Sequence, residues 1–295
     1  MKKLSQIAAF ILAATMTVSL SACGSTSTTS SAAVSAAASE AASVASEAVS
    51  AAAASSAAST TLDKIKSDGF VTWSTNAEFE PFEYKDGDSV IGIDADISQK
   101  IADKLGVKLK INDVSFDTLT TELSSGKTNF VAAGMTVTED RKKNVDFSDT
   151  YFDASQAIIV PKGSAIKSRT DLNGKKVGVQ QGTTGDTFCT NEDGKSDIKV
   201  GSTERYTKGV DAVTDLINGK IDAVVIDDFP ATKFVEKNSG KLAKLSDALT
   251  VEKYAIAVKK GDDAMLKTIN DVLAEMKTSG ELTKTIEKYK AALGA

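Results

Sequence analysis

The sequence predicts an α/β fold for the chain beyond residue 61, and three observations lead to this prediction. Short strands alternate with amphipathic helices from about residue 62 onward. Residues 177–179 and 221–226 are continuous apolar strands, which is typical of buried parallel sheets. A helix, a Gly-Lys turn and a strand occur in this order twice, around 126–131 and 219–224. Because ligands bind beyond the carboxyl ends of such strands, two similar lobes facing each other would form a cleft.

The first elements follow from hydrophobic spacing. Residues 70–74 (FVTWS) read as a strand. Ile97, Ile101 and Leu105 share one face of a predicted helix, which we expect to end at Gly106, a residue suited to a helix C-terminus.

The next elements are predicted from hydrophobic spacing in the same way. Apolar residues alternate over 107–111, which indicates a strand, and Phe116, Leu119 and Leu123 mark a helix closed by Gly126. The last long helix is expected over about residues 262–279. Six apolar residues recur there at helical spacing: Met265, Leu266, Ile269, Val272, Leu273 and Met276.

The N-terminal segment is predicted to be a targeting signal. Lys2 and Lys3 precede an apolar stretch over 7–20 that is too short to span a membrane, so we interpret residues 1–22 as a signal peptide. Residues 20–24 (LSACG), at the end of this segment, resemble a bacterial lipobox, which implies lipidation of Cys23. The alternative is an ordinary signal peptide with a chance cysteine.

Residues 23–61 are predicted to form a lipidated cysteine followed by a linker. This segment consists almost entirely of Ser, Ala and Thr with a few Glu and Val residues, and it lacks large apolar side chains to close a core. We therefore expect an extracytoplasmic protein anchored by lipid to the cell membrane. Cys189 then has no partner cysteine and is expected to be a buried or inert thiol.

Composition excludes several classes of function. The chain has 295 residues and no histidine, so Ser-His-Asp catalysis and histidine-ligated metal sites are ruled out. A formal charge of −5 argues against a nucleic-acid partner. No metal site, cofactor or oligomer is predicted, and a monomer is expected.

Six ordered motifs carry a family resemblance. They are NAEFEPFEY at 76–84, IGIDAD at 91–96, GMTVTEDR at 134–141, DFSDTY at 146–151, KKVGVQQGTTG at 175–185 and DAVVIDDFP at 222–230. In this order they resemble the extracellular solute-binding proteins, family 3, of ABC importers for polar amino acids.

The resemblance implies a periplasmic-binding-protein type II fold, in which two α/β lobes are joined by two crossover hinge strands. Lobe 1 would comprise residues 62–152 and 255–295, and residues 153–254 would form lobe 2 with the hinge strands. The crossovers would fall near 152–156 and 254–257.

An α-amino acid needs a fixed cation for its carboxylate and a fixed anion for its ammonium group. The family motif assigns the carboxylate to Arg141, with Thr136, Thr183 and Thr184 as further contacts. Arg141 is one of only three arginines in the chain, and arginine suits a planar bidentate contact. The alternative is that Arg141 is a solvent-exposed charge on a helix.

The ammonium group is assigned to Asp228, with Gly134 and Thr136. Asp227 and Asp228 follow an apolar strand, where acids are costly unless a cation arrives. Either could instead cap the following helix.

Five residues are predicted to surround the ligand side chain by motif position: Asn76, Glu78, Phe79, Phe116 and Gln180. Phe79 and Phe116 would form aromatic walls, although Phe116 could equally belong to the core. The two amides favour a neutral polar ligand such as glutamine or cystine. A cationic ligand such as arginine or histidine stays open, because Glu78 could supply an acid.

The predicted function is a tethered receptor that binds a polar amino acid and delivers it to an ABC permease, without catalysis. A same-fold enzyme of the dehydratase type and a sensor-like binding module are the alternatives. The enzyme would need a cleft acid such as Glu78, Asp227 or Asp228.

Overall fold

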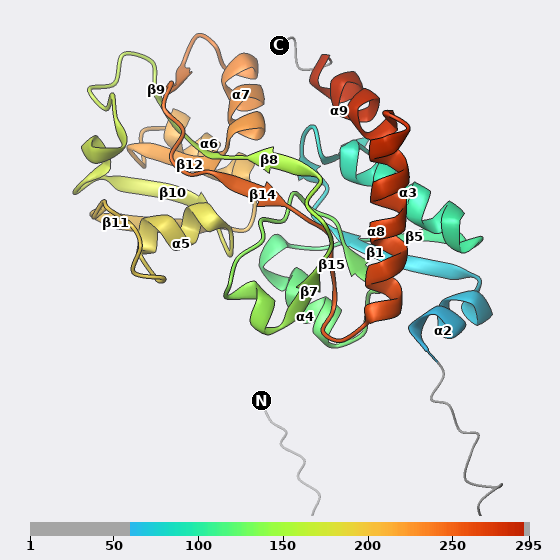
Figure 1. The fold of residues 1–295 in the computed structure, drawn as a ribbon. Coiled ribbons are helices and arrows are strands. Elements are labelled where there is room, and N and C mark those ends of the chain that lie inside the picture. Colours follow the sequence, from blue (N-terminus) through green and yellow to red (C-terminus); the bar gives the residue numbers. More distant parts are fainter. Residues whose placement is uncertain (1–59, 292–295) are drawn as a thin grey trace, which may run out of the picture. The chain divides into compact units, whose positions relative to one another are not determined.

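The computed structural model describes residues 60–291, which are drawn in colour in Figure 1. This part of the chain contains two five-stranded mixed sheets, each packed against its own helices, and confirms the predicted α/β class. We call them lobe 1 and lobe 2 in the order in which the chain enters them. The predicted signal peptide at 1–22, Cys23 and the linker up to residue 59 lie outside the described residues.

Lobe 1 is built on a sheet with strand order β5-β1-β6-β15-β7, in which β1 runs parallel to β5 and β6 while β15 is antiparallel to β6 and β7. Its strands are β1 (Phe70–Thr75), β5 (Lys108–Asp113), β6 (Phe130–Val131), β7 (Val145–Phe147) and β15 (Ala257–Lys259). Its helices are α2 (Thr61–Asp68), α3 (Ile93–Leu105), α4 (Leu119–Ser124), α8 (Asp263–Thr278) and α9 (Glu281–Ala291), with short 3-10 turns η1 (Phe116–Thr118) and η2 (Arg141–Lys143). A small antiparallel sheet adds β2 (Glu78–Phe79), β3 (Glu83–Asp86) and β4 (Ser89–Ile91).

Lobe 2 repeats this plan with strand order β11-β10-β12-β9-β13, in which β10 is parallel to β11 and β12 while β9 is antiparallel to β12 and β13. Its strands are β9 (Gln156–Pro161), β10 (Lys176–Gln180), β11 (Ser202–Tyr206), β12 (Ala223–Asp227) and β13 (Leu242–Lys244). Its helices are α5 (Thr184–Thr190), α6 (Gly209–Ile217) and α7 (Asp228–Lys237), with the turn η3 (Arg169–Leu172).

The two repeated Gly-Lys units occupy equivalent places. They lead into β6 and β12, the central strands of the two sheets, and each central strand has one parallel and one antiparallel neighbour. Gly126 and Gly219 begin the two units with φ of 74° and 70°, values that L side chains rarely adopt. The sequence echo therefore reflects a shared topology.

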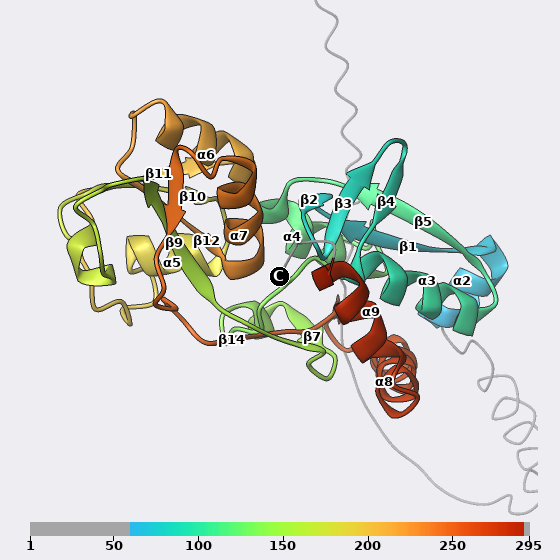
Figure 2. The same cartoon turned by 90° about the horizontal axis from the view of Figure 1, so that it is seen from above.

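Two strands lie where the chain passes between the sheets. β8 (Phe152–Ala154) pairs antiparallel with β14 (Glu252–Tyr254), and Phe152 lies opposite Tyr254. Figure 1 shows the two strands side by side, and in Figure 2 β14 runs between the halves that contain the sheets. These strands join the two lobes.

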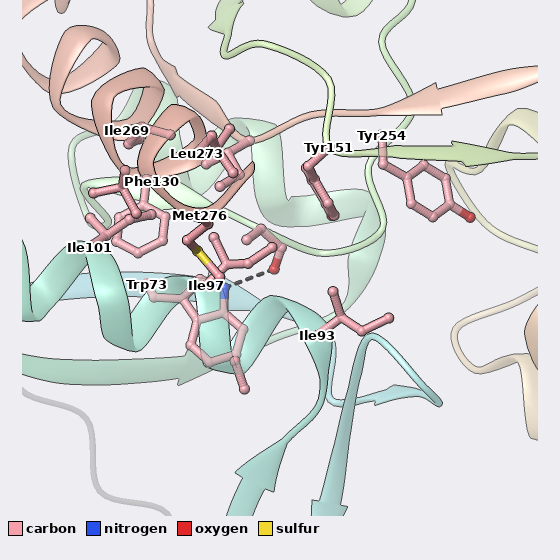
Figure 3. Close-up of a cluster of buried hydrophobic side chains, with 14 of the residues drawn as sticks. Trp73, Ile93, Ile97, Ile101, Phe130, Tyr151, Tyr254, Ile269, Leu273 and Met276 are labelled. Carbon is pink, nitrogen blue, oxygen red and sulfur yellow. Dashed lines mark hydrogen bonds between the residues drawn. The ribbon is translucent and has the colours of Figure 1, made fainter. Parts of the chain in front are cut away.

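The core of lobe 1 is centred on Trp73 in β1, which is fully buried. Its indole Nε1 donates to the carbonyl oxygen of Ala132 at 2.7 Å, so the polar end of this side chain is satisfied. Figure 3 shows Ile97 and Ile101 from α3 near it, with Met276, Leu273 and Ile269 from α8 above the ring. In lobe 2, two apolar clusters contain alternate residues of β9 and β12, as expected for a sheet covered on both faces.

Most predicted elements are present with shifted ends. The helix marked by Ile97 begins at Ile93, and Gly106 caps it in the left-handed conformation as expected. The helix expected from Phe116 begins as the 3-10 turn η1, and α9 follows the predicted long helix as a separate element. Ile111 is 40% exposed because β5 is an edge strand. Among residues 60–291, no helix has the length and apolar character needed to cross a membrane.

Candidate functional site

A pocket lies between the two lobes and gathers most of the predicted ligand contacts. Eleven residues line it: Asn76, Phe79, Glu83, Phe116, Gly134, Thr136 and Arg141 from lobe 1, and Gln180, Thr183, Thr184 and Asp227 from lobe 2. Of the residues predicted to contact the ligand, only Asp228 and Glu78 do not line it.

The two sheets bring these residues together by the ends of their strands. Gly134 and Thr136 follow β6, Thr183 follows β10, and Asp227 is the last residue of β12. Strands of the two sheets thus deliver their carboxyl ends to one pocket, as in other open α/β sheets. Gly134 has a φ of 52°, and a Cβ atom there would lie 2.6 Å from the Phe79 ring, so glycine is needed for this aromatic wall.

Arg141 is held at the pocket by one carbonyl from each lobe. Its Nη1 donates to Thr136 O at 2.7 Å and its Nη2 to Gly182 O at 3.0 Å, while its guanidinium carbon lies 5.3 Å from the centre of the Phe116 ring. Burial lowers the pKa of Arg141 to about 10, against the opposing effect of nearby carboxylates. The side chain therefore stays cationic at neutral pH in a fixed orientation.

Asp227 is the acid of lobe 2 that faces the pocket, and it is 6% exposed. Its Oδ2 accepts from Gln156 Nε2 at 2.7 Å, and its Oδ1 accepts from the Tyr254 hydroxyl. Burial, followed by the nearby charge of Glu252, raises the pKa of Asp227 well above its usual range. A cation entering the pocket would stabilise its ionised form.

Asp228 and Glu78 are placed elsewhere. The Asp228 side chain is 39% exposed and its Oδ1 accepts from Lys244 Nζ at 2.6 Å, outside the pocket. The Glu78 carboxylate pairs with Lys208 across the lobes and lines a separate surface hollow. Adjacent residues at a strand end point in different directions, so sequence position alone does not decide which acid enters a site.

Glu83 lines the pocket and was not among the predicted residues. It is 1% exposed, and its Oε2 receives no hydrogen bond from an N–H or hydroxyl group of residues 60–291. Burial, together with the neighbouring carboxyl of Asp94, raises the pKa of Glu83 well above its usual range. Asp94 in turn accepts from Gly134 N and the Tyr151 hydroxyl, both at 2.8 Å. The available sequence signal was an acid between two aromatic residues in the motif at 76–84.

The two predicted amides are already bonded to each other. Gln180 Nε2 donates to Asn76 Oδ1 at 2.9 Å across the lobes, and Asn76 Nδ2 donates to Val114 O at 3.0 Å. Gln180 Nε2 also donates to Thr207 O at 3.3 Å, so both of its N–H groups are used, and Asn76 keeps one N–H. This part of the pocket therefore offers more acceptors than donors to a ligand.

The threonines of the turn before α5 have defined partners as well. The Thr183 hydroxyl donates to Gln180 O at 2.8 Å and accepts from Asp186 N at 3.2 Å, capping α5. The Thr184 hydroxyl donates to Glu252 Oε2 at 2.9 Å.

No group of acids and thiols in the described region could hold a metal ion. Cys189 is buried in lobe 2, and burial raises the pKa of its thiol to about 12, as expected for an inert cysteine.

Comparison with known proteins identifies the family. Residues 71–292 match the bacterial extracellular solute-binding proteins, family 3. A probable histidine-binding protein from Neisseria gonorrhoeae is 37% identical over 226 residues, which cover 75% of this chain and 83% of that protein. The arginine-binding extracellular protein ArtP from Bacillus subtilis (strain 168) is 35% identical, covering 73% of this chain and 84% of that protein. Other relatives are named for cystine and glutamine binding.

Solved structures agree with this comparison. Holo ArgBP from T. maritima is 45% identical and aligns with a TM-score of 0.67 over 73% of this chain and 93% of that chain. These relatives are binding proteins rather than enzymes, and the two-lobed type II architecture expected from the motifs is confirmed. The chain therefore belongs to the bacterial extracellular solute-binding proteins, family 3.

Proposed function

We propose that this protein is the receptor of an ABC importer for a basic amino acid, with L-arginine as the leading candidate. The observation that carries this proposal is the buried carboxyl of Glu83, which lines the pocket beside Asp94 and has no cationic partner there. The name of the ArtP relative is consistent with it.

The charge of the pocket supports a cationic ligand. Arg141 is the only basic residue among those that line it, whereas two acids, Glu83 and Asp227, line it as well. The carboxyl groups of Asp94 and Glu252 lie directly behind the lining. A zwitterionic ligand leaves this acidic excess unchanged, whereas a guanidinium or ammonium side chain offsets part of it.

The α-carboxylate would bind the guanidinium of Arg141, whose orientation is fixed by carbonyls of both lobes, with Thr183 and Thr184 beside it. For the α-ammonium group we propose Asp227 in place of Asp228, because only Asp227 lines the pocket. Thr136 and Gly134 would complete this contact.

The side chain would lie between Phe79 and Phe116, which suit a planar cation. A guanidinium has five N–H donors and no acceptor, which matches the acceptors left by Asn76, Gln180 and Glu83. The side-chain amide of glutamine could donate its N–H₂ group to the same acceptors. Its carbonyl oxygen, however, would face acceptors rather than donors. The acceptors of the pocket therefore favour a basic ligand, whereas the two amides in the sequence favoured a neutral one.

We further propose that the protein is tethered to the outer side of the cell membrane through a lipid on Cys23, and that it delivers its ligand to the permease from there. The support is the lipobox-like segment at 20–24 and the Ser/Ala-rich linker that follows it.

Isothermal titration of the full chain with the common L-amino acids tests the ligand. We expect L-arginine to bind most tightly, and Glu83→Gln to weaken arginine at least about tenfold while changing glutamine by less than about threefold. Asp86→Asn, a change of an exposed acid in the same strand, is the control. Tight binding of glutamine with no binding of arginine would refute the basic-ligand proposal.

A further inference from the structure

Glu252 connects the pocket residues of the two lobes, although it does not line the pocket itself. It lies in β14, the strand between the lobes, and is 7% exposed. Its Oε2 accepts from Thr136 Oγ1 of lobe 1 at 2.6 Å and from Thr184 Oγ1 of lobe 2 at 2.9 Å. Its Oε1 accepts from Thr250 Oγ1 at 2.8 Å.

These bonds determine what the two pocket threonines can offer a ligand. A hydroxyl group has one proton to donate and two lone pairs with which to accept. Because Thr136 and Thr184 both donate to Glu252, only their lone pairs remain for other partners. An oriented lone pair suits an ammonium group and repels a carboxylate.

Gln156 connects Glu252 and Thr184 to Asp227, the acid of lobe 2 that lines the pocket. Gln156 Nε2 lies 3.2 Å from Thr184 Oγ1, 3.4 Å from Glu252 Oε2 and 2.7 Å from Asp227 Oδ2. The main-chain N–H of Gln156 donates to Thr250 Oγ1 at 2.9 Å. Glu252 thus lies at the centre of a hydrogen-bond network that reaches Asp227 through Gln156.

We propose that Glu252 is a positioning residue of the amino-acid site, which accepts the hydroxyl protons of Thr136 and Thr184 and so turns both hydroxyls into acceptors for the ligand's α-ammonium group. The inference rests on the proposed function in one respect, that the pocket takes an α-amino acid. It does not depend on which side chain the ligand carries. It leaves the α-carboxylate to Arg141, because the Thr184 hydroxyl beside that group has already given its proton to Glu252.

A structural role alone would have a different signature. If Glu252 only stabilised the fold, its replacement would lower the melting temperature of the unliganded protein. It would then weaken ligand binding by the same factor whether or not the Thr136 hydroxyl is present. If it acts through Thr136, its effect on binding must shrink when the Thr136 hydroxyl is already gone, which a double-mutant cycle measures.

The test uses the full chain titrated calorimetrically with L-arginine, L-histidine and L-glutamine, and continues with whichever binds the wild type most tightly. Glu252→Gln keeps the size of the side chain and replaces one acceptor oxygen by a donor. We expect it to weaken binding about tenfold or more. Glu122→Gln, the same chemical change on α4 away from the pocket, should change the dissociation constant by less than about threefold.

The cycle is completed with Thr136→Val and the double variant. In the Thr136→Val background we expect the effect of Glu252→Gln to be at least about threefold smaller than in the wild type. An equal effect in both backgrounds, or binding by Glu252→Gln within threefold of the wild type, would overturn the proposal. Wild-type binding of glutamine but not arginine would refute only the proposed ligand, whereas binding of no amino acid would refute both.

Discussion

Asp227 and Asp228 are neighbours in the chain but have opposite environments: Asp227 is 6% exposed in the interlobe pocket, whereas the Asp228 side chain is 39% exposed and paired with Lys244. Asp227 ends β12 and Asp228 begins α7. The change from strand to helix at this point turns the two side chains apart.

This pair gives a matched test of the ammonium contact. We expect Asp227→Asn to weaken binding of L-arginine about a hundredfold, because the ammonium group would lose its buried counter-charge at a cost of about 3 kcal/mol. Asp228→Asn should change the affinity by less than about threefold, since it removes a partly exposed ion pair. Calorimetry of both variants checks this, and a loss for Asp228→Asn as large as for Asp227→Asn would contradict it.

Arg141 should not be replaceable by lysine. Its two amino groups donate to Thr136 O and Gly182 O, one carbonyl in each lobe, and a single ammonium cannot hold both and also meet a carboxylate. We expect about a tenfold loss of affinity for Arg141→Lys and about a hundredfold loss for Arg141→Ala. Lys142→Ala, beside it on the surface, is the control in the same titrations. Near-normal binding by Arg141→Ala would place the carboxylate elsewhere.

Glu83 should make the unliganded protein less stable as the pH rises. Because burial and Asp94 raise the pKa of Glu83 in the folded state, its contribution is fully present below the pKa of the unfolded chain and is lost as the pH rises through the folded pKa. We therefore expect Glu83→Gln to raise the melting temperature of the unliganded chain more at about pH 8 than at about pH 5. Thermal melts of the wild type and the variant at both values measure this. An equal change at both would show that Glu83 is not neutral in the folded state.

Cys23 should determine attachment to the membrane. We expect Cys23→Ala to abolish lipid labelling and to move the protein from the membrane to the soluble fraction, because the proposed anchor is a single modified residue. Cell fractionation with Cys189→Ala as the matched control checks this. Membrane retention of Cys23→Ala would mean that another anchor exists.

The sequence by itself determined the class of fold and the family. Hydrophobic periodicity located β1, α3 and α8, because a residue's burial in a regular element repeats with the period of that element. The repeated Gly-Lys unit pointed to two similar sheets, and the ordered motifs contain ten of the eleven residues that line one pocket. Local patterns suffice for these features because they depend on neighbours along the chain.

Only the tertiary structure decided which side chains of those motifs face the interlobe pocket. Asp227 rather than Asp228 lines it, Glu83 replaces Glu78 as the buried acid, and Glu252 reaches Thr136 across 116 positions of the chain. The direction of a side chain at a strand end and the packing of one lobe against the other depend on long-range contacts. A one-residue shift at such an end moves a carboxylate from a pocket to the surface, and no local pattern records that choice.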